Sequence, residues 1–151
     1  MALEAVHVLL IEDSLGDVRL TQEALKDNRI HVQLSVVHDG EEAMHFLRRQ
    51  GSYAAARRPD LMLLDLNLPR KNGREVLEEI KSDETLRQIP VVVLTTSKSD
   101  QDVLKAYRLH ANCYIVKPVD FAQFSTVIKL IGEFWLAVVK LPQDSGQERS
   151  S

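Results

Sequence analysis

Five short runs of apolar residues recur along the chain and constrain its fold more than any other feature. Most are nearly continuous and rich in Val, Ile and Leu, as expected of strands buried on both faces of a parallel sheet. We therefore predict five parallel strands. The runs are VHVLLI at 6–11, VQLSVV at 32–37, LMLLD at 61–65, VVVLT at 91–95 and CYIV at 113–116.

Segments with apolar residues at helical spacing follow each of these runs. In residues 73–82, for example, Val76, Leu77 and Ile80 fall on one side of a helix. Strands that alternate with helices predict an α/β fold of three layers with right-handed crossovers. The five predicted helices cover residues 16–28, 41–50, 73–82, 100–110 and 121–141.

The length and composition of the chain fit one domain of ordinary size. It has 151 residues, and 44% of them are apolar, which is enough for one sizeable core. We predict a single domain over residues 1–141. The remaining segment, PQDSGQERSS at 142–151, is polar and predicted to be a flexible tail.

The charge and the apolar pattern exclude several classes of protein. A net charge of −3 with mixed signs argues against non-specific binding of nucleic acid. No apolar stretch reaches the roughly 20 residues of a membrane span, and the first residues do not resemble a signal peptide. Cys113 is the only cysteine, so we expect no internal disulfide and a cytoplasmic location.

Polar residues of a particular kind stand at the ends of four predicted strands. Glu12 and Asp13 follow the first strand, Asp65 ends the third, Thr95 ends the fourth and Lys117 follows the fifth. The carboxyl ends of parallel strands share one edge of the sheet, where ligands bind. We therefore expect these side chains to meet.

Three carboxylates in one crevice repel one another unless a cation lies among them. Mg²⁺ prefers oxygen ligands and keeps some of its waters, so a few carboxylates and a carbonyl suffice to hold it. With a lysine and a hydroxyl added, the set is typical of phosphoryl transfer, in which an aspartate can act as the nucleophile.

Each of these residues also has an ordinary structural interpretation. Asp13 could cap a helix, Asp65 could begin a turn, Thr95 suits a strand, and Lys117 could lie in solvent. Taken together, these interpretations require the polar groups to reach one sheet edge by chance.

The same motifs resemble the receiver domain of two-component response regulators, from about Val6 to about Val139. The matching motifs are the acid pair after the first strand, LLDLNLP, VVVLTTS and the KP that follows the fifth strand. The resemblance implies a flavodoxin-like three-layer sandwich whose parallel sheet has the strand order 2-1-3-4-5. It also implies that Asp65 accepts a phosphoryl group from a sensor histidine kinase.

The resemblance assigns roles to further residues. Glu12, Asp13 and Asp65 would hold Mg²⁺ together with the backbone carbonyl of Asn67. Lys117 would pair with the phosphoryl group.

The resemblance also implies a switch between two conformations. Thr95 would hydrogen-bond the new phosphoryl group, and Tyr114 would move inward in response. Asn67 and Ser97 occupy positions that tune hydrolysis of the phosphate in the family. The Lys117–Pro118 peptide bond is cis in the family.

A narrower resemblance is to the small regulators that partner cyanobacterial bacteriophytochromes. It rests on the long connection before RRPDL, on LHANCYIVKPVD and on FWLAVVKLP. It implies a phytochrome-type kinase as the partner, a receiver without an effector domain, and a tendency to form dimers.

The last predicted helix has an apolar stripe wider than a surface helix needs. Extra core packing is one explanation, and a homodimer interface is the other. We predict a homodimer whose interface includes Tyr107, Phe124, Ile131, Phe134 and Trp135.

Three other functions are weaker interpretations. An aspartate-type phosphatase needs a second carboxylate two positions after the nucleophile, where this chain has Asn67. A flavodoxin-like nucleotide binder needs a phosphate loop after the first strand, where EDSLGD places acids. A pseudo-receiver that only binds partners does not need the full acidic set. We therefore expect a signalling protein that assists only its own phosphorylation and dephosphorylation.

Overall fold

The computed structural model describes residues 6–96, 100–108, 110–117 and 120–134, and it contains one five-stranded sheet. The strands are β1 (Val6–Ile11), β2 (Val32–Val37), β3 (Leu61–Leu64), β4 (Val91–Thr95) and β5 (Cys113–Val116). Their order is β2-β1-β3-β4-β5, and every neighbouring pair is parallel. The predicted sheet and strand order are confirmed.

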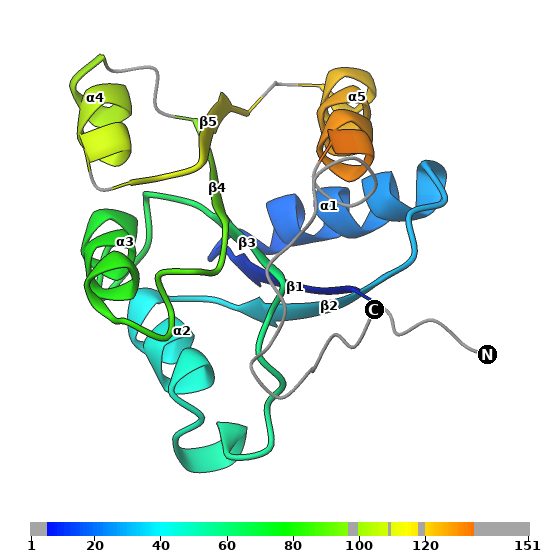
Figure 1. The fold of residues 1–151 in the computed structure, drawn as a ribbon. Helices are drawn as coiled ribbons and strands as arrows, with labels where there is room; N and C mark the ends of the chain where they lie inside the picture. Colours follow the sequence, from blue (N-terminus) through cyan, green and yellow to red (C-terminus); the bar gives the residue numbers. More distant parts are fainter. Residues whose placement is uncertain (1–5, 97–99, 109, 118–119, 135–151) are drawn as a thin grey trace, which may run out of the picture.

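Helices cover both faces of this sheet, as predicted. They are α1 (Leu15–Asp27), α2 (Gly40–Leu47), α3 (Gly73–Ser82), α4 (Asp100–Arg108) and α5 (Phe121–Ile131), with a short 3₁₀ helix, η1 (Gly51–Tyr53). Figure 1 shows α1 and α5 on one side of the sheet and α2, α3 and α4 on the other.

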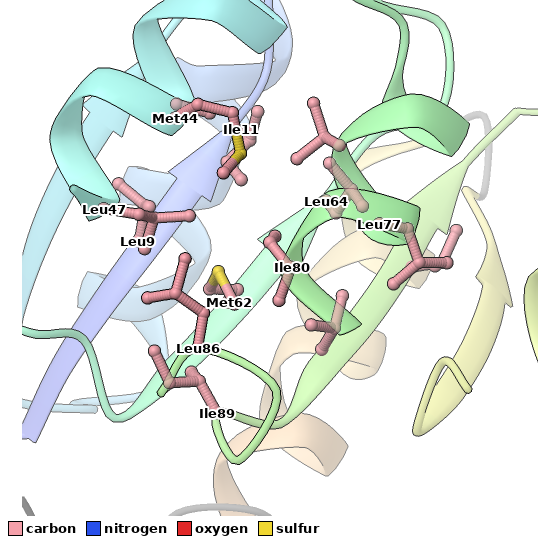
Figure 2. Packing of buried hydrophobic residues seen from close by; sticks show 14 of the residues in the cluster. Leu9, Ile11, Met44, Leu47, Met62, Leu64, Leu77, Ile80, Leu86 and Ile89 are labelled. Carbon is pink, nitrogen blue, oxygen red and sulfur yellow. The ribbon is translucent and has the colours of Figure 1, made fainter. Parts of the chain in front are cut away.

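The continuous apolar runs follow from this two-sided cover. Successive strand side chains point to opposite faces. Leu9 and Ile11 pack with residues of α2 and α3, whereas Val8 and Leu10 pack with residues of α1 and α5. Figure 2 shows the first of these two clusters, in which Met62 and Leu64 of β3 lie between the two helices. The core thus holds the central strands rigidly beneath the edge where they end.

Four helices, α1, α2, α3 and α5, begin with a side-chain N-cap just beyond the carboxyl edge of the sheet. Ser14, Asp39, Asn72 and Asp120 each accept a hydrogen bond from a backbone N–H three residues later. Asn72 and Glu75 form a complete capping box at the start of α3. These caps fix where the loops at the sheet edge turn into helices.

Among the described residues, the predicted and observed helix ends differ most at α2. The helix predicted over 41–50 ends at Leu47, because the backbone of Arg49 takes a left-handed conformation with φ 56° and the chain then enters η1. The helix predicted over 121–141 is described as α-helix to Ile131. Residues 135–151, which include Trp135 and the predicted flexible tail, lie outside the described residues.

Two residues assigned to a dimer interface belong instead to the core of the chain. Phe124 is 2% exposed and Ile131 is 6% exposed, and both pack against strands on the α1–α5 face of the sheet. The apolar stripe on α5 is therefore explained in part by core packing. Tyr107 and Phe134 are exposed.

Within the described ranges, no helix has the length and apolar character needed to cross a membrane.

Gly73 offers a test of the close packing at the carboxyl edge. A Cβ atom there would lie 2.3 Å from the backbone oxygen of Asp65 and 2.5 Å from Cα of Leu66. Gly73→Ala should therefore lower the free energy of unfolding by about 2 kcal/mol or more. In the control Gly16→Ala, the new methyl group would come no closer than 3.8 Å to its nearest neighbour, and stability should hold or rise. Equal urea midpoints for the two variants would contradict this packing.

Candidate functional site

An acidic cluster lies where β1 and β3 end. The backbone N–H of Glu12 donates to Val37 and that of Asp65 donates to Ile11, both at 3.0 Å, so the sheet's hydrogen bonding extends to both acids. Glu12 and Asp65 are buried, whereas Asp13 is exposed. One carboxylate oxygen from each of the three acids lies within 4.8 Å of the others. The predicted convergence of these acids is confirmed.

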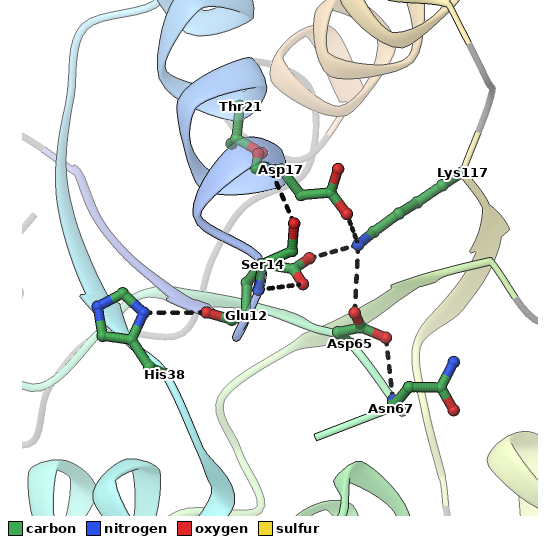
Figure 3. Close-up of polar contacts among 8 residues, drawn as sticks. All are labelled: Glu12, Ser14, Asp17, Thr21, His38, Asp65, Asn67 and Lys117. Carbon is green, nitrogen blue, oxygen red and sulfur yellow. Dashed lines mark hydrogen bonds and ion pairs between the residues drawn. The ribbon is translucent and has the colours of Figure 1, made fainter. Parts of the chain in front are cut away.

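Lys117 brings the positive charge of the cluster from the end of β5. Its backbone N–H donates to Thr95 at 2.8 Å, and its side chain is 5% exposed. The Nζ atom donates to Asp17 Oδ2 at 2.8 Å, to Asp65 Oδ2 at 3.2 Å and to Glu12 Oε1 (Figure 3). The ammonium group therefore lies among three carboxylates.

The buried groups do not share their charge evenly. Burial and a hydrogen bond with Asp65 together raise the pKa of Glu12 to about 8, against the opposing effect of Lys117. Burial also favours the neutral form of Asp65, but hydrogen bonds from Glu12, from the Asn67 N–H and from Lys117 hold its pKa below the ordinary value. Near pH 7 without a metal, Glu12 thus keeps a proton and Asp65 is ionised.

The same environment keeps Lys117 charged. Burial lowers the pKa of an ammonium group, but hydrogen bonds to Asp17 and Glu12 outweigh this effect and raise the pKa of Lys117 above its usual value. A fixed positive charge therefore stands 3.2 Å from the ionised Asp65 carboxylate.

One further group contacts Asp65, and a buried hydroxyl ends the next strand of the sheet. The backbone N–H of Asn67 donates to Asp65 Oδ1 at 3.0 Å, which orients the carboxylate. Thr95 ends the neighbouring strand, where Leu64 pairs with Val93. Its Oγ1 atom is buried and has no hydrogen-bond partner within the part of the chain that the structure describes. A buried hydroxyl without a partner is available to an added acceptor group.

The donor set fits a hard divalent cation. Glu12, Asp13 and Asp65 offer only oxygen atoms, and the exposure of Asp13 leaves one side open to water ligands. A cation there would replace the proton that Glu12 otherwise keeps.

Two residues beside the cluster, Asp17 and His38, were not predicted from the sequence. Asp17 lies in the first turn of α1, where an acid is expected for the helix dipole alone, so no local pattern pointed to its contact with Lys117. His38 Nδ1 lies 3.2 Å from the backbone oxygen of Glu12 (Figure 3). Nothing in the spacing of the histidines points to this contact.

Comparison with known proteins decides the family. A model of the response regulator receiver domain matches residues 8–129. The chain belongs to the response regulator receiver family. The similar proteins include response regulator Rcp1 of Synechocystis sp., which is 50% identical over 135 residues, covering 89% of this chain and 92% of Rcp1. The methanogenesis regulatory protein FilR2 of Methanothrix harundinacea is 39% identical over 136 residues, covering 89% of this chain and 86% of FilR2.

Solved structures agree with this assignment. The phosphorylated cyanobacterial phytochrome response regulator RcpA is 51% identical, with a TM-score of 0.89, over 93% of this chain and 100% of RcpA. The Mn²⁺-bound form of Rcp1 is 49% identical, with a TM-score of 0.87, over 91% of this chain and 99% of Rcp1. The flavodoxin-like receiver fold and the narrower resemblance to phytochrome-associated regulators are therefore confirmed.

The remaining predicted residues fall in different places. Tyr114 is half-buried, packs against the core cluster on the α2–α3 face, and donates its backbone N–H to Tyr107 Oη at 3.2 Å. Ser97 and Pro118 lie outside the described residues, and so does the predicted cis bond.

The raised pKa of Glu12 predicts how the stability of the metal-free receiver depends on pH. The folded chain keeps a proton on Glu12 up to about pH 8, whereas an unfolded chain loses it near 4.5. The free energy of unfolding should therefore fall as pH rises through this window, by up to about 5 kcal/mol. Urea denaturation in chelator at both ends of the window measures the fall.

Glu12→Gln is the matched control, because its amide keeps the shape of the side chain and does not titrate. The fall should be much smaller in this variant, and saturating Mg²⁺ should reduce it in the wild type. Parallel pH profiles for the two proteins would count against the assignment to Glu12.

Proposed function

We propose that this receiver accepts a phosphoryl group on Asp65 from a phosphohistidine of a sensor histidine kinase. The observation that carries the proposal is the environment of Asp65. It is an ionised carboxylate that lies 3.2 Å from a buried ammonium group and within reach of the carboxylates of two further acids. Membership of the receiver family supports the same reaction.

The chemistry follows from the charges of the residues. An Asp65 oxygen attacks phosphorus, a new P–O bond forms, and the P–N bond to the kinase histidine breaks, with its electron pair returning to the imidazole. Lys117 offsets the negative charge that gathers on the phosphoryl oxygens. The Asn67 N–H fixes the carboxylate through its other oxygen.

We propose Mg²⁺ as the resident metal, held by Glu12, Asp13, Asp65 and the backbone carbonyl of Asn67. When bound, it supplies positive charge to the phosphoryl oxygens. The Mn²⁺-bound structure of Rcp1 supports a divalent cation in a similar protein. The proton on Glu12 must leave when the metal binds.

Thr95 and Tyr114 are the proposed switch. Because the Thr95 hydroxyl is buried, a phosphoryl oxygen at Asp65 would give it a hydrogen-bond partner and draw it toward β3. Tyr114 lies on β5, the strand that pairs with β4 and thus with Thr95. A shift of Thr95 therefore changes the space beside Tyr114.

The similar proteins suggest the partner and the setting. RcpA is a cyanobacterial phytochrome response regulator, so we infer a phytochrome-type histidine kinase acting in the cytoplasm. We also infer that this receiver signals through protein contacts, as a receiver domain does when phosphorylation changes its surface. A receiver that binds partners without being phosphorylated is the alternative.

Phosphorylation by a small-molecule donor separates these two functions. Wild-type protein with Mg²⁺ should take up label from acetyl phosphate, and excess chelator should abolish the uptake. Asp65→Asn should remove the label, whereas Asp27→Asn, an exposed acid at the far end of α1, should keep it. Label that persists in Asp65→Asn would rule out Asp65 as the acceptor. An unlabelled wild type would favour the interaction module.

We further propose that the receiver forms a homodimer through the exposed apolar residues of α4 and the end of α5. Tyr107, Leu130 and Phe134 are 48%, 56% and 54% exposed. Leu130 and Phe134 are four positions apart, so they lie on the same side of a helical segment. Such exposure favours an interface between copies.

The double substitution Leu130→Ser and Phe134→Ser should convert the dimer to a monomer, as measured by analytical ultracentrifugation. Phe121→Ser is the control, because Phe121 is exposed at the opposite end of α5. An unchanged mass for the double variant would place any interface elsewhere.

A further inference from the structure

Asp17 is a carboxylate at the site that the proposed phosphotransfer leaves without a role. It lies in the first turn of α1, 100 positions from Lys117 in sequence. Its Oδ2 accepts a hydrogen bond from Lys117 Nζ at 2.8 Å, which is shorter than the 3.2 Å between Nζ and Asp65. Asp17 is therefore a close partner of the ammonium group.

The number of donors on Lys117 matches the number of its carboxylate acceptors. A lysine ammonium has three N–H donors, and those of Lys117 go to Glu12, Asp17 and Asp65. Glu12 and Asp65 also belong to the trio of acids placed to hold a cation, and Asp17 does not. When a cation occupies the trio, Asp17 is the carboxylate left to Lys117.

The backbone of Asp17 is itself fixed by two hydrogen bonds. The backbone N–H of Asp17 donates to the N-cap Ser14 at 3.2 Å, and its carbonyl accepts from Thr21 Oγ1 at 2.9 Å. The Asp17 side chain is 31% exposed, whereas that of Lys117 is 5% exposed. Asp17 thus fixes the end of a long, flexible side chain from a rigid helix at the rim of the site.

We propose that Asp17 is a positioning residue that holds the Lys117 ammonium beside Asp65 and thereby speeds transfer of the phosphoryl group. This inference rests on the proposed function. A purely structural role for Asp17 would be to stabilise the N-terminus of α1 through the helix dipole, and that role does not involve Lys117.

Phosphorylation rates separate the two roles. With acetyl phosphate and saturating Mg²⁺, Asp17→Asn should lower the limiting rate about five-fold, which is the scale of a partly exposed charge-assisted hydrogen bond. Asp17→Glu restores the carboxylate and should recover most of the rate. Glu23→Gln, an exposed acid on the same helix, should match wild type. An Asp17→Asn rate equal to wild type, or an Asp17→Glu rate as low as that of Asp17→Asn, would overturn the proposal.

The contact can also be observed without phosphorylation. In metal-free protein the Lys117 ammonium should exchange its protons slowly and give an NMR signal, assigned by its loss in Lys117→Arg. Asp17→Asn should remove or broaden this signal, and Glu23→Gln should not. An unchanged signal in Asp17→Asn would show that Asp17 does not hold Lys117.

The controls separate failure of this proposal from failure of the proposed function. Label that survives Asp65→Asn would contradict the phosphoacceptor. Label that is lost in Asp65→Asn but taken up at the wild-type rate in Asp17→Asn would contradict the role of Asp17 alone.

Discussion

The burial of one lysine among carboxylates is the interaction on which this receiver depends. Removing a charged group from water is costly unless partners with good geometry surround it. Lys117 meets that condition because each of its N–H donors has a carboxylate acceptor. The buried acids are not fully compensated by Lys117, since Glu12 keeps a proton that a cation would displace. The site is therefore balanced to take up positive charge and then a phosphoryl group.

The strand order explains why these groups meet at this point. The chain runs from β1 through α1 to the edge strand β2, and then crosses back so that β3 lies on the other side of β1. As a result, α1 leaves β1 on one face of the sheet and α3 leaves β3 on the other (Figure 1). The two connections diverge and leave a crevice between the strand ends. Glu12 and Asp65 stand on its two sides.

The strands were predictable because both of their faces are buried. A continuous apolar run leaves little freedom about where a buried strand lies, and four of the five strand ranges agree with the structure. Helix ends were less predictable. The helix α2 stops before Arg49, whose backbone is left-handed, and an arginine gives no sign of that conformation in the sequence. The apolar stripe of α5 showed which side is buried. It could not show that Phe124 and Ile131 pack within the chain, because core and interface select the same side chains.

The site was predictable to the extent that the sheet edge collects strand ends. Glu12, Asp13, Asp65 and Lys117 each follow or end a strand, so topology alone brings them together. Asp17 lies on a helix, and its contact with Lys117 depends on how α1 is placed relative to β5. That placement comes from tertiary packing, including the hydrogen bonds from Asn28, the C-cap of α1, to Ser125 on α5 at 2.9 and 3.1 Å. Local patterns do not encode it.

The hydroxyl of Thr95 is buried and has no hydrogen-bond partner among the described residues, which suggests how one added phosphoryl group can change the conformation. A buried hydroxyl without a hydrogen bond costs about 1–3 kcal/mol. Under the proposed function, the unphosphorylated state carries that cost and the phosphorylated state does not. Thr95 lies on β4, the neighbouring strand β5 carries Tyr114, and Lys117 directly follows β5. One added group thus acts on the carboxyl ends of both strands, because the Thr95 hydroxyl gains a hydrogen-bond partner and the Lys117 ammonium group gains a new acceptor. A bias of that size is enough to shift a two-state equilibrium whose states differ by a few kcal/mol.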